Sequence, residues 1–185
     1  MDKREEKTLK AINDAFTTLI NNKDYDDITI QDILELSKVS RSTFYAHYKT
    51  KDELLLSISN HIFEHVFSKS LQEEKTHDFS KDLFYDYKHL IVHIFYHVRD
   101  EKELFKGILS NRVNELFLNE FRTHISHFVA SYLNNYPVRV DFIPLELRKS
   151  LAVENFIVVL KYWVNDGYKE TPEEISGYYI KSVIG

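Results

Sequence analysis

Hydrophobic residues in the first part of the chain recur every three or four positions, which is the spacing of one face of an α-helix. The first such stretch predicts a helix from about Asp2 to Asn22. Its apolar face consists of Leu9, Ile12, Phe16, Leu19 and Ile20. The polar segment 21–24 follows, so we expect the helix to end there.

Three further helix starts follow close together, each with its own capping signal. Thr29 precedes an apolar turn and has Asp32 three residues later, which resembles a capping box and predicts a short helix ending near Leu36. Ser40 is placed to cap a third short helix, and Thr50 to cap a long fourth one. Short helices in such close succession are typical of a helix-turn-helix.

The rest of the chain also shows helical patterns and no sign of a sheet. None of the four Gly and three Pro residues precedes Gly107, although strand turns commonly need residues that tolerate positive φ. Further helices are predicted over residues 50–70, 79–99, 101–110, 112–133 and 145–166, and from Pro172 onward. We therefore predict an all-α fold, with a helix-turn-helix domain in residues 1–50 and a helical effector-binding and dimerisation domain in residues 51–185.

Composition narrows the classes of protein that are possible. The 185 residues are 43% hydrophobic and 29% charged, as in an ordinary globular protein. The chain has no cysteine, which excludes disulfides, thiolate nucleophiles and Cys-ligated metal sites. No apolar run approaches the ~20 residues of a membrane helix, and the charged start at residues 1–6 is unlike a signal peptide. We expect a cytoplasmic protein with no membrane association.

The charge pattern points to nucleic acid, although the formal net charge is −5. Residues 37–51 contain no acidic residue and four basic ones, which are Lys38, Arg41, Lys49 and Lys51. Phosphate attraction is local, because salt screens charges beyond ~8 Å under physiological conditions. If Phe44 and Tyr48 face inward, then Arg41, Ser42 and Tyr45 face outward from the third helix, where they suit a major groove.

Three segments, Ile28–Ile33, Val39–Tyr48 and Lys51–Leu54, together closely resemble the DNA-binding domain of the TetR family of transcriptional regulators. The resemblance covers about the first 55 residues. The sequence Tyr-Trp-Val-Asn-Asp-Gly-Tyr at 162–168 is similar to the C-terminal domain of many Gram-positive members, including relatives of dihydroxyacetone-kinase regulators. The resemblance implies a homodimer that binds double-stranded DNA at a palindromic operator.

The same resemblance assigns roles to individual residues. Arg41 and Ser42 occupy positions similar to the family's base-reading residues, and Gln31 matches another position that reaches a base. Thr43, Tyr45, His47 and Lys51 resemble its phosphate-binding residues. The complete predicted DNA-contacting set is Thr29, Gln31, Lys38, Ser40, Arg41, Ser42, Thr43, Tyr45, His47 and Lys51. Lys38 stands where the family usually has glycine, so we expect a left-handed backbone there, at a cost of about 1 kcal/mol.

The helix predicted over residues 145–166 indicates dimerisation. Residues 151–164 are apolar or aromatic with few exceptions, and a helix that is apolar all round must be covered on two sides. We expect one side to face its own core and the other to face a second copy, with help from the last helix. The predicted interface is Leu151, Phe156, Val159, Leu160, Trp163, Ile175, Tyr178 and Tyr179.

Residues 61–185 hold 21 aromatic residues, which can line a small-molecule cavity or simply fill the core. The candidate effector-binding residues are Tyr85, His89, His93, Tyr96, Phe117, Phe121 and Trp163. Histidine spacings that can bind metal occur at Asp86, His89, His93 and His97, and at His61 with His65. No further ligands accompany them, so we predict no metal and no cofactor.

The predicted function is a ligand-responsive repressor whose effector changes the separation of its two DNA-binding domains. One alternative is a regulator controlled by a protein partner, or recruiting one, and acting as an activator. An enzyme is the other alternative. The chain has no nucleophile elbow, phosphate-binding loop or paired-carboxylate motif, so we predict that it is not an enzyme.

Overall fold

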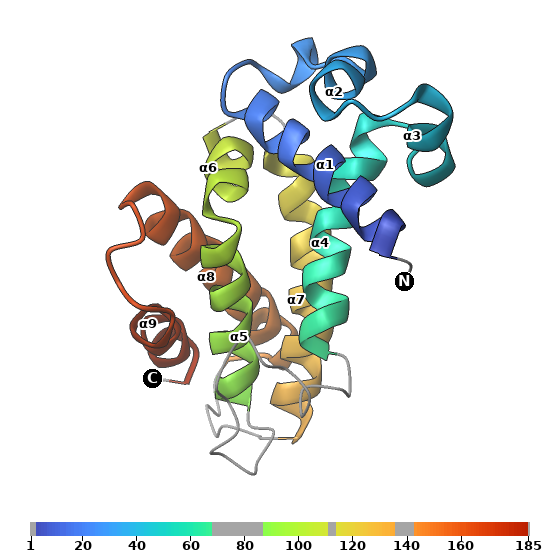
Figure 1. Ribbon diagram of the computed structural model, residues 1–185. Coiled ribbons are helices and arrows are strands. Elements are labelled where there is room, and N and C mark those ends of the chain that lie inside the picture. Colours follow the sequence, from blue (N-terminus) through green and yellow to red (C-terminus); the bar gives the residue numbers. More distant parts are fainter. Residues whose placement is uncertain (1–2, 68–86, 111–113, 136–142, 185) are drawn as a thin grey trace. The chain divides into compact units, whose positions relative to one another are not determined.

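The computed structural model describes residues 3–67, 87–110, 114–135 and 143–184. Every regular element among these residues is a helix, which confirms the all-α prediction for this part of the chain (Figure 1). The elements are α1 (Lys3–Ile20), the 3-10 helix η1 (Tyr25–Asp27), α2 (Ile30–Ser37), α3 (Arg41–His47), α4 (Lys51–Phe67), α5 (Tyr87–Asp100), α6 (Lys102–Ser110), α7 (Asn114–Asn135), α8 (Leu145–Asn165) and α9 (Pro172–Ile184).

The described residues pack as two compact units. The first unit contains the residues up to Ile58 together with those of Lys102–Phe117, and the second contains those of Ser59–Glu101 and from Leu118 onward. The sequence pattern placed the division after residue 50. Among the described residues, packing groups the first turns of α4 and the whole of α6 with the first unit. The division into a DNA-binding domain, residues 1–50, and an effector-binding and dimerisation domain, residues 51–185, stays a prediction.

Side chains from α1, η1, α2, α3, α4 and α6 contribute to the core of the first unit. The buried set includes Ile12, Phe16, Ile20, Tyr25, Ile33, Phe44, Leu54, Leu55, Leu104, Phe105 and Ile108. Three of the five apolar residues predicted for the first helix, namely Ile12, Phe16 and Ile20, are at most 2% exposed. The helical periodicity therefore identified the inner face of α1 correctly.

The predicted caps define the short helices. The Thr29 hydroxyl accepts from the Asp32 N–H at 3.1 Å, and the Asp32 carboxylate accepts from the Thr29 N–H at 2.7 Å, which completes a capping box. The Ser40 hydroxyl accepts from the Thr43 N–H at 3.1 Å, and the Thr50 hydroxyl from the Glu53 N–H at 3.0 Å. All three predicted helix starts are confirmed to within one residue.

The second unit is built around stacked aromatic rings. Phe156 lies at its centre, with ring centroids 5.1 Å from Phe95, 5.9 Å from Phe121 and 5.2 Å from Tyr179. Phe95 also contacts Trp163 edge to face at 5.4 Å. All five rings are fully buried, so they hold α5, α7, α8 and α9 together.

Gly107 allows α6 to approach α1 closely within the first unit. A Cβ at this position would lie 2.6 Å from Cγ2 of Ile20 and 3.0 Å from Nδ2 of Asn21. The Asn21 amide donates to the Glu103 carbonyl of α6 at 2.8 Å, which fixes the same contact. Glycine is therefore required here by space, although it weakens the helix by its backbone freedom.

We expect Gly107→Ala to lower the free energy of unfolding by about 1–3 kcal/mol, because the added methyl group overpacks against Ile20. Helix propensity alone predicts the opposite sign, a gain of up to about 1 kcal/mol. Urea denaturation of the two proteins measures the difference. A variant as stable as the parent, or more so, would show that α6 does not pack against α1 in this way.

Candidate nucleic-acid interface

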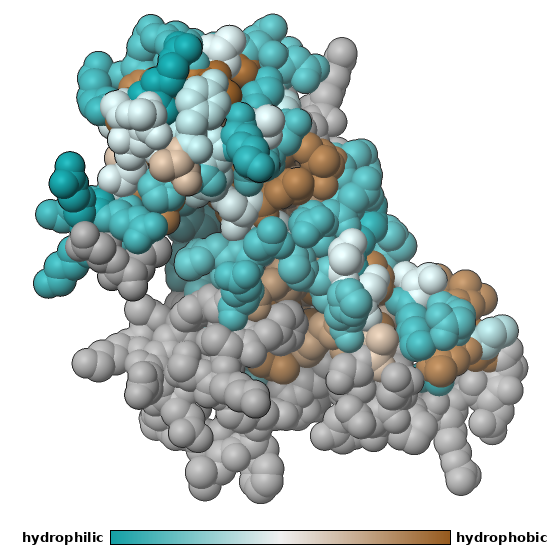
Figure 2. All heavy atoms as spheres, turned by 90° about the vertical axis from the view of Figure 1, so that its right-hand side faces the viewer, coloured by the Kyte–Doolittle hydropathy of each residue, from teal (hydrophilic) through white to brown (hydrophobic). Residues whose placement is uncertain are grey.

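Helices α2 and α3 form a helix-turn-helix joined by residues 38–40. The Phe44 ring is completely buried and lies 5.8 Å from the Tyr48 ring, so the inner side of α3 is anchored in the core of the first unit. The opposite side of α3 carries Arg41, Ser42 and Tyr45, all of them exposed as predicted. The top of Figure 2, where the first unit lies, is mostly hydrophilic.

Lys38 terminates α2 in a left-handed conformation, with φ 59° and ψ 21°. Its N–H donates to the Leu34 carbonyl at 3.0 Å, which satisfies one of the last carbonyls of the helix. The left-handed backbone expected from the sequence is thus confirmed. A residue with a Cβ is strained in this conformation. Glycine would therefore fit the position better than the exposed lysine that occupies it.

Three hydroxyl groups meet at the start of α3. The Ser40 hydroxyl lies 2.7 Å from the Thr43 hydroxyl and 3.0 Å from the Ser42 hydroxyl. The same Ser40 oxygen accepts from the Thr43 N–H. The predicted contacts Ser40, Ser42 and Thr43 therefore form one hydroxyl cluster at the positive end of a short helix.

Arg41 is linked to α2 by side-chain hydrogen bonds. Its Nη2 donates to Oε1 of Gln31 at 2.8 Å, and Nε2 of Gln31 donates to Oε1 of Glu35 at 2.8 Å. Two predicted base-contacting residues are thus in direct contact. The sequence analysis missed Glu35, although its i, i+4 spacing from Gln31 on a helix signals such a pair.

The remaining predicted contacts on α3 differ in exposure. The Tyr45 side chain is 47% exposed, and its ring packs edge to face on Phe44 at 5.7 Å. His47 is half-buried, with its ring 6.2 Å from that of Tyr48. Both rings are therefore supported by the core while keeping part of their surface outside it.

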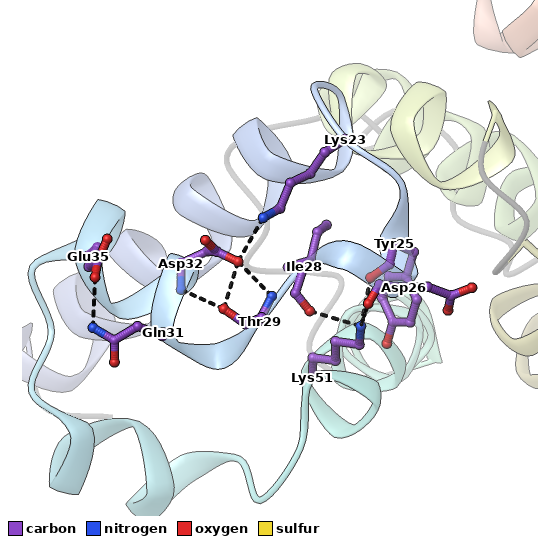
Figure 3. Close-up of polar contacts among 9 residues, drawn as sticks. All are labelled: Lys23, Tyr25, Asp26, Ile28, Thr29, Gln31, Asp32, Glu35 and Lys51. Atoms are coloured by element: carbon purple, nitrogen blue, oxygen red, sulfur yellow. Dashed lines mark hydrogen bonds and ion pairs between the residues drawn. The ribbon is translucent and has the colours of Figure 1, made fainter.

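Lys51 lies at the start of α4 and donates into the backbone that precedes α2 (Figure 3). Its ammonium nitrogen is 2.6 Å from the Tyr25 carbonyl oxygen, 2.9 Å from that of Ile28 and 3.2 Å from that of Asp26. A lysine has three N–H donors, and these contacts use all of them. A phosphate contact from Lys51 stays a prediction, and it requires one of these bonds to be exchanged.

Tyr25 completes this contact between η1 and α4. Its ring lies under the Lys51 ammonium, 4.3 Å from ring centroid to nitrogen, and its hydroxyl donates to the Asp52 carboxylate. Burial and the hydrogen bond to Asp52 raise the pKa of the Tyr25 hydroxyl above its ordinary value. The sequence analysis missed Tyr25, because the contact joins residues 26 positions apart and leaves no local pattern.

Thr29 has a local structural role in the capping box of α2. Its hydroxyl donates to the Asp32 carboxylate at 2.7 Å, and Lys23 donates to the same carboxylate oxygen at 2.8 Å. The hydrogen bond from Lys23, followed by those from Thr29, lowers the pKa of the Asp32 carboxyl well below its usual range. The Asp32 carboxylate therefore stays ionised, and keeps α2 capped, to a lower pH than an ordinary aspartate would.

The candidate effector residues lie in different settings. In the second unit, Phe121 and Trp163 are fully buried in the aromatic core, and His93, 2% exposed, has its Nε2 atom 3.0 Å from Nε2 of His97. Tyr96 donates to the Glu173 carboxylate, and His89 is half-buried. Phe117 belongs to the first unit, where it packs edge to face on Phe105. Tyr85 lies outside the described residues.

The candidate interface residues on α8 and α9 divide between two sides. Those that are fully buried within the chain are Phe156, Leu160, Trp163, Ile175 and Tyr179. Leu151 and Tyr178 are 46% and 50% exposed, and Val159 is half-buried. The other large exposed apolar or aromatic side chains on α8 are Leu145, Leu147, Val158 and Tyr162, at 41%, 51%, 64% and 49%.

Among the described residues, no group of three or more His, Asp or Glu side chains is arranged to hold a metal ion. Asp86 and the side chain of His65, which belong to the predicted spacings, lie outside the described part. None of the helices in the described ranges combines the length and apolar character that crossing a membrane requires.

Two family models together match most of the chain. Residues 85–184 match a transcriptional regulator C-terminal region, and residues 12–58 match the bacterial regulatory proteins of the tetR family. A TetR transcriptional regulator from Streptococcus agalactiae 2603V is 31% identical, aligns over 98% of this chain and 96% of its own, and has a TM-score of 0.71. The dihydroxyacetone kinase operon activator DhaS, at 17% identity and TM-score 0.62, aligns over 96% of this chain and 94% of its own and shows a similar fold.

Curated relatives match shorter segments. The uncharacterized HTH-type transcriptional regulator YxbF of Bacillus subtilis is 45% identical over 56 residues, which are 30% of this chain and 15% of that protein. The HTH-type dhaKLM operon transcriptional activator DhaS of Lactococcus lactis is 33% identical over 66 residues, which are 36% and 33%. The chain thus spans a third or less of the length of these relatives.

We expect Lys38→Gly to raise the free energy of unfolding by about 1 kcal/mol, because glycine adopts φ 59° without strain. The same change removes an exposed positive charge, so DNA affinity should fall and its salt dependence should flatten by up to one unit of slope. Lys38→Ala is the matched control: it removes the charge but keeps the strain. Equal stability of the Gly and Ala variants would contradict this interpretation.

For Lys51→Ala we expect a loss of about 1–3 kcal/mol in the free energy of unfolding, because three carbonyl groups lose a charged donor. Thermal denaturation measures this loss, and titration of DNA at several salt concentrations measures the slope. In the exposed Lys49→Ala control, stability should stay within about 0.5 kcal/mol. Because the predicted phosphate contact is lost too, we expect the salt slope to fall by about one unit in Lys51→Ala. An unchanged slope would remove Lys51 from the phosphate contacts, and unchanged stability would contradict the role of the three carbonyl bonds.

Proposed function

Because the chain belongs to the TetR family of transcriptional regulators, a non-enzymatic family of DNA-binding proteins, we propose that it is a ligand-responsive repressor that binds a palindromic operator as a homodimer. The observation that carries this proposal is the placement of α3. The helix is held from behind by the buried Phe44 and presents Arg41 and Ser42 to solvent. An exposed helix face that carries an arginine and is held in this way fits a major groove.

The contacts that we propose fall into two groups. Arg41 reads a base, since its planar guanidinium suits a bidentate contact with guanine, and Ser42 and Gln31 lie beside it in the reading group. The phosphate contacts are made by hydroxyl, aromatic and basic side chains around the helix-turn-helix, which are Thr29, Lys38, Ser40, Thr43, Tyr45, His47 and Lys51. Phosphate contacts fix the orientation on DNA, and base contacts provide the sequence preference.

Dimerisation is supported by one side of α8. Leu147, Leu151, Val158 and Tyr162 repeat at helical spacing along that helix and are each at least 46% exposed. Tyr178 of α9 is exposed too, and Asn155 of α8 donates to the Ser182 carbonyl of α9 at 3.3 Å, so the two helices pack together. A second copy that covered this face would remove the exposed apolar surface from water.

Effector control remains part of the proposal. An effector bound in the second unit would favour one arrangement of the two α3 helices, and DNA release would follow from its different affinity for the two states. Tyr96, His89 and His93 are the polar candidates for binding it. The Tyr96 hydroxyl hydrogen-bonds to Glu173, and this bond, followed by burial, raises the pKa of Tyr96.

A second candidate function is activation, with a protein partner in place of the small molecule. It is suggested by DhaS, an operon activator that is similar to this chain in sequence over 66 residues and in fold over nearly the whole length. Deleting the gene distinguishes the two. Transcription of the target rises if the protein represses and falls if it activates.

The DNA-binding proposal is tested by fluorescence anisotropy with the duplex upstream of the protein's own gene and with a scrambled duplex of equal composition. Specific binding typically exceeds non-specific binding by at least about 10³-fold at physiological salt. We expect a preference of that order and two chains per duplex. Equal affinity for both duplexes would remove this promoter as the operator, and equal affinity for all promoter duplexes would contradict a sequence-specific repressor.

We expect Val158→Asp to convert the protein to a monomer, because it places a charge in the centre of the proposed apolar interface. Sedimentation equilibrium should then show one chain, and operator affinity should fall by at least about tenfold as the second DNA-binding unit is lost. Ser126→Asp adds the same charge at an exposed site on α7 and serves as the control. A dimer that persists in Val158→Asp would show that this face of α8 is not the interface.

A further inference from the structure

We propose that Glu35 is a specificity-determining positioning residue, which acts through Gln31 to hold the Arg41 guanidinium in the orientation that reads a base. This inference rests on the proposed base contact of Arg41. It adds a residue that does not itself touch DNA. Glu35 then determines how strictly the operator sequence is read rather than how tightly DNA is held.

The geometry is a chain of two hydrogen bonds that crosses from α2 to α3. Glu35 accepts from Nε2 of Gln31 at 2.8 Å within α2, and Figure 3 shows these two side chains side by side. Gln31 in turn accepts from Nη2 of Arg41 at 2.8 Å through its Oε1 atom. The carboxylate is therefore connected to the first residue of α3 through a single amide.

The polarity of that amide explains why a hydrogen-bond acceptor is needed at residue 35. The carbonyl end of Gln31 must face Arg41, because the guanidinium has only donors. The other end then presents N–H groups, and an ionised Glu35 has only acceptors. Turning the amide over would place donor against donor at Arg41 and acceptor against acceptor at Glu35, so the two charged neighbours fix its orientation from both sides.

The contact leaves Arg41 able to read DNA. A guanidinium carries five N–H donors, and the bond to Gln31 uses one of them. Bidentate contact with the O6 and N7 atoms of guanine needs two more. Gln31 has its carbonyl and one N–H engaged, so its main part in the interface is to support Arg41.

The negative charge of Glu35 is unfavourable for DNA binding, and a role in base reading offsets this disadvantage. Glu35 is exposed on α2 and stands just before residues 37–51, a segment that contains no acid. A negative charge near the proposed phosphate contacts weakens binding to every DNA sequence. Ordering one flexible side chain before binding improves the correct contact by a factor of about two to ten.

The test uses two substitutions of Glu35 that differ in one property. Glu35→Ala removes both the charge and the hydrogen-bond acceptor, whereas Glu35→Gln removes the charge and keeps an acceptor for Gln31. Both are exposed substitutions, so their unfolding free energies should stay within about 0.5 kcal/mol of the parent. Circular dichroism melts confirm that each protein is folded.

Binding is measured with duplexes selected from a random library by the full-length protein, followed by single-base variants of the selected sequence. Arg41→Ala first identifies the base pair that Arg41 reads. We expect Glu35→Ala to lower discrimination at that base pair by about two- to tenfold, with other positions unchanged. Glu35→Gln should keep the discrimination, and both variants should bind random DNA at least as tightly as the parent.

Two further variants test whether the effect passes through the two hydrogen bonds that connect Glu35 with Arg41. Gln31→Ala should lower discrimination at the same base pair as Arg41→Ala does. In an Arg41→Ala background, Glu35→Ala should lower discrimination no further. The inference is overturned if Glu35→Ala leaves discrimination intact, matches Glu35→Gln, or acts at other base pairs. If the parent protein itself selects no sequence, the proposed DNA-reading function fails, which is a separate outcome.

Discussion

The arrangement of the whole DNA-binding surface depends on the burial of one aromatic ring, that of Phe44. Helix α3 has only seven residues, too few to be stable as an isolated helix in water. Its direction is therefore set by tertiary contacts, and Phe44, 0% exposed, provides the central one. Ser40 caps one end, and Tyr45 and Tyr48 pack on the Phe44 ring. Every outward-facing group on the helix takes its position from this contact.

A second constraint links the start of α4 to the segment before α2. The Lys51 ammonium binds three carbonyl groups around η1, and the neighbouring Asp52 accepts from the Tyr25 hydroxyl. Because these bonds are short and mutually supporting, the first turn of α4 and η1 form one rigid element. A movement of that turn would therefore carry η1 with it.

Local signals in the sequence predicted much of this structure, and tertiary contacts account for the rest. The caps at Thr29, Ser40 and Thr50 follow from short-range rules and are confirmed. The left-handed backbone at Lys38 was expected from the family resemblance and is confirmed too. Periodicity also identified the exposed side of α3. Residues 151–164 are apolar nearly all round and show no distinct polar face, so the pattern could not separate the buried Phe156 from the exposed Val158. Lys51 was assigned by resemblance, and only the fold shows which carbonyl groups surround it.

In the proposed complex, two copies of α3, brought together by pairing of the chains, read successive major grooves on one face of DNA. Hydroxyl-radical footprinting of the selected duplex tests it most directly. We expect two protected patches related by two-fold symmetry, with the reading helices about 34–36 Å apart, or one helical turn. A single protected patch, or protection spread evenly along the duplex, would contradict it.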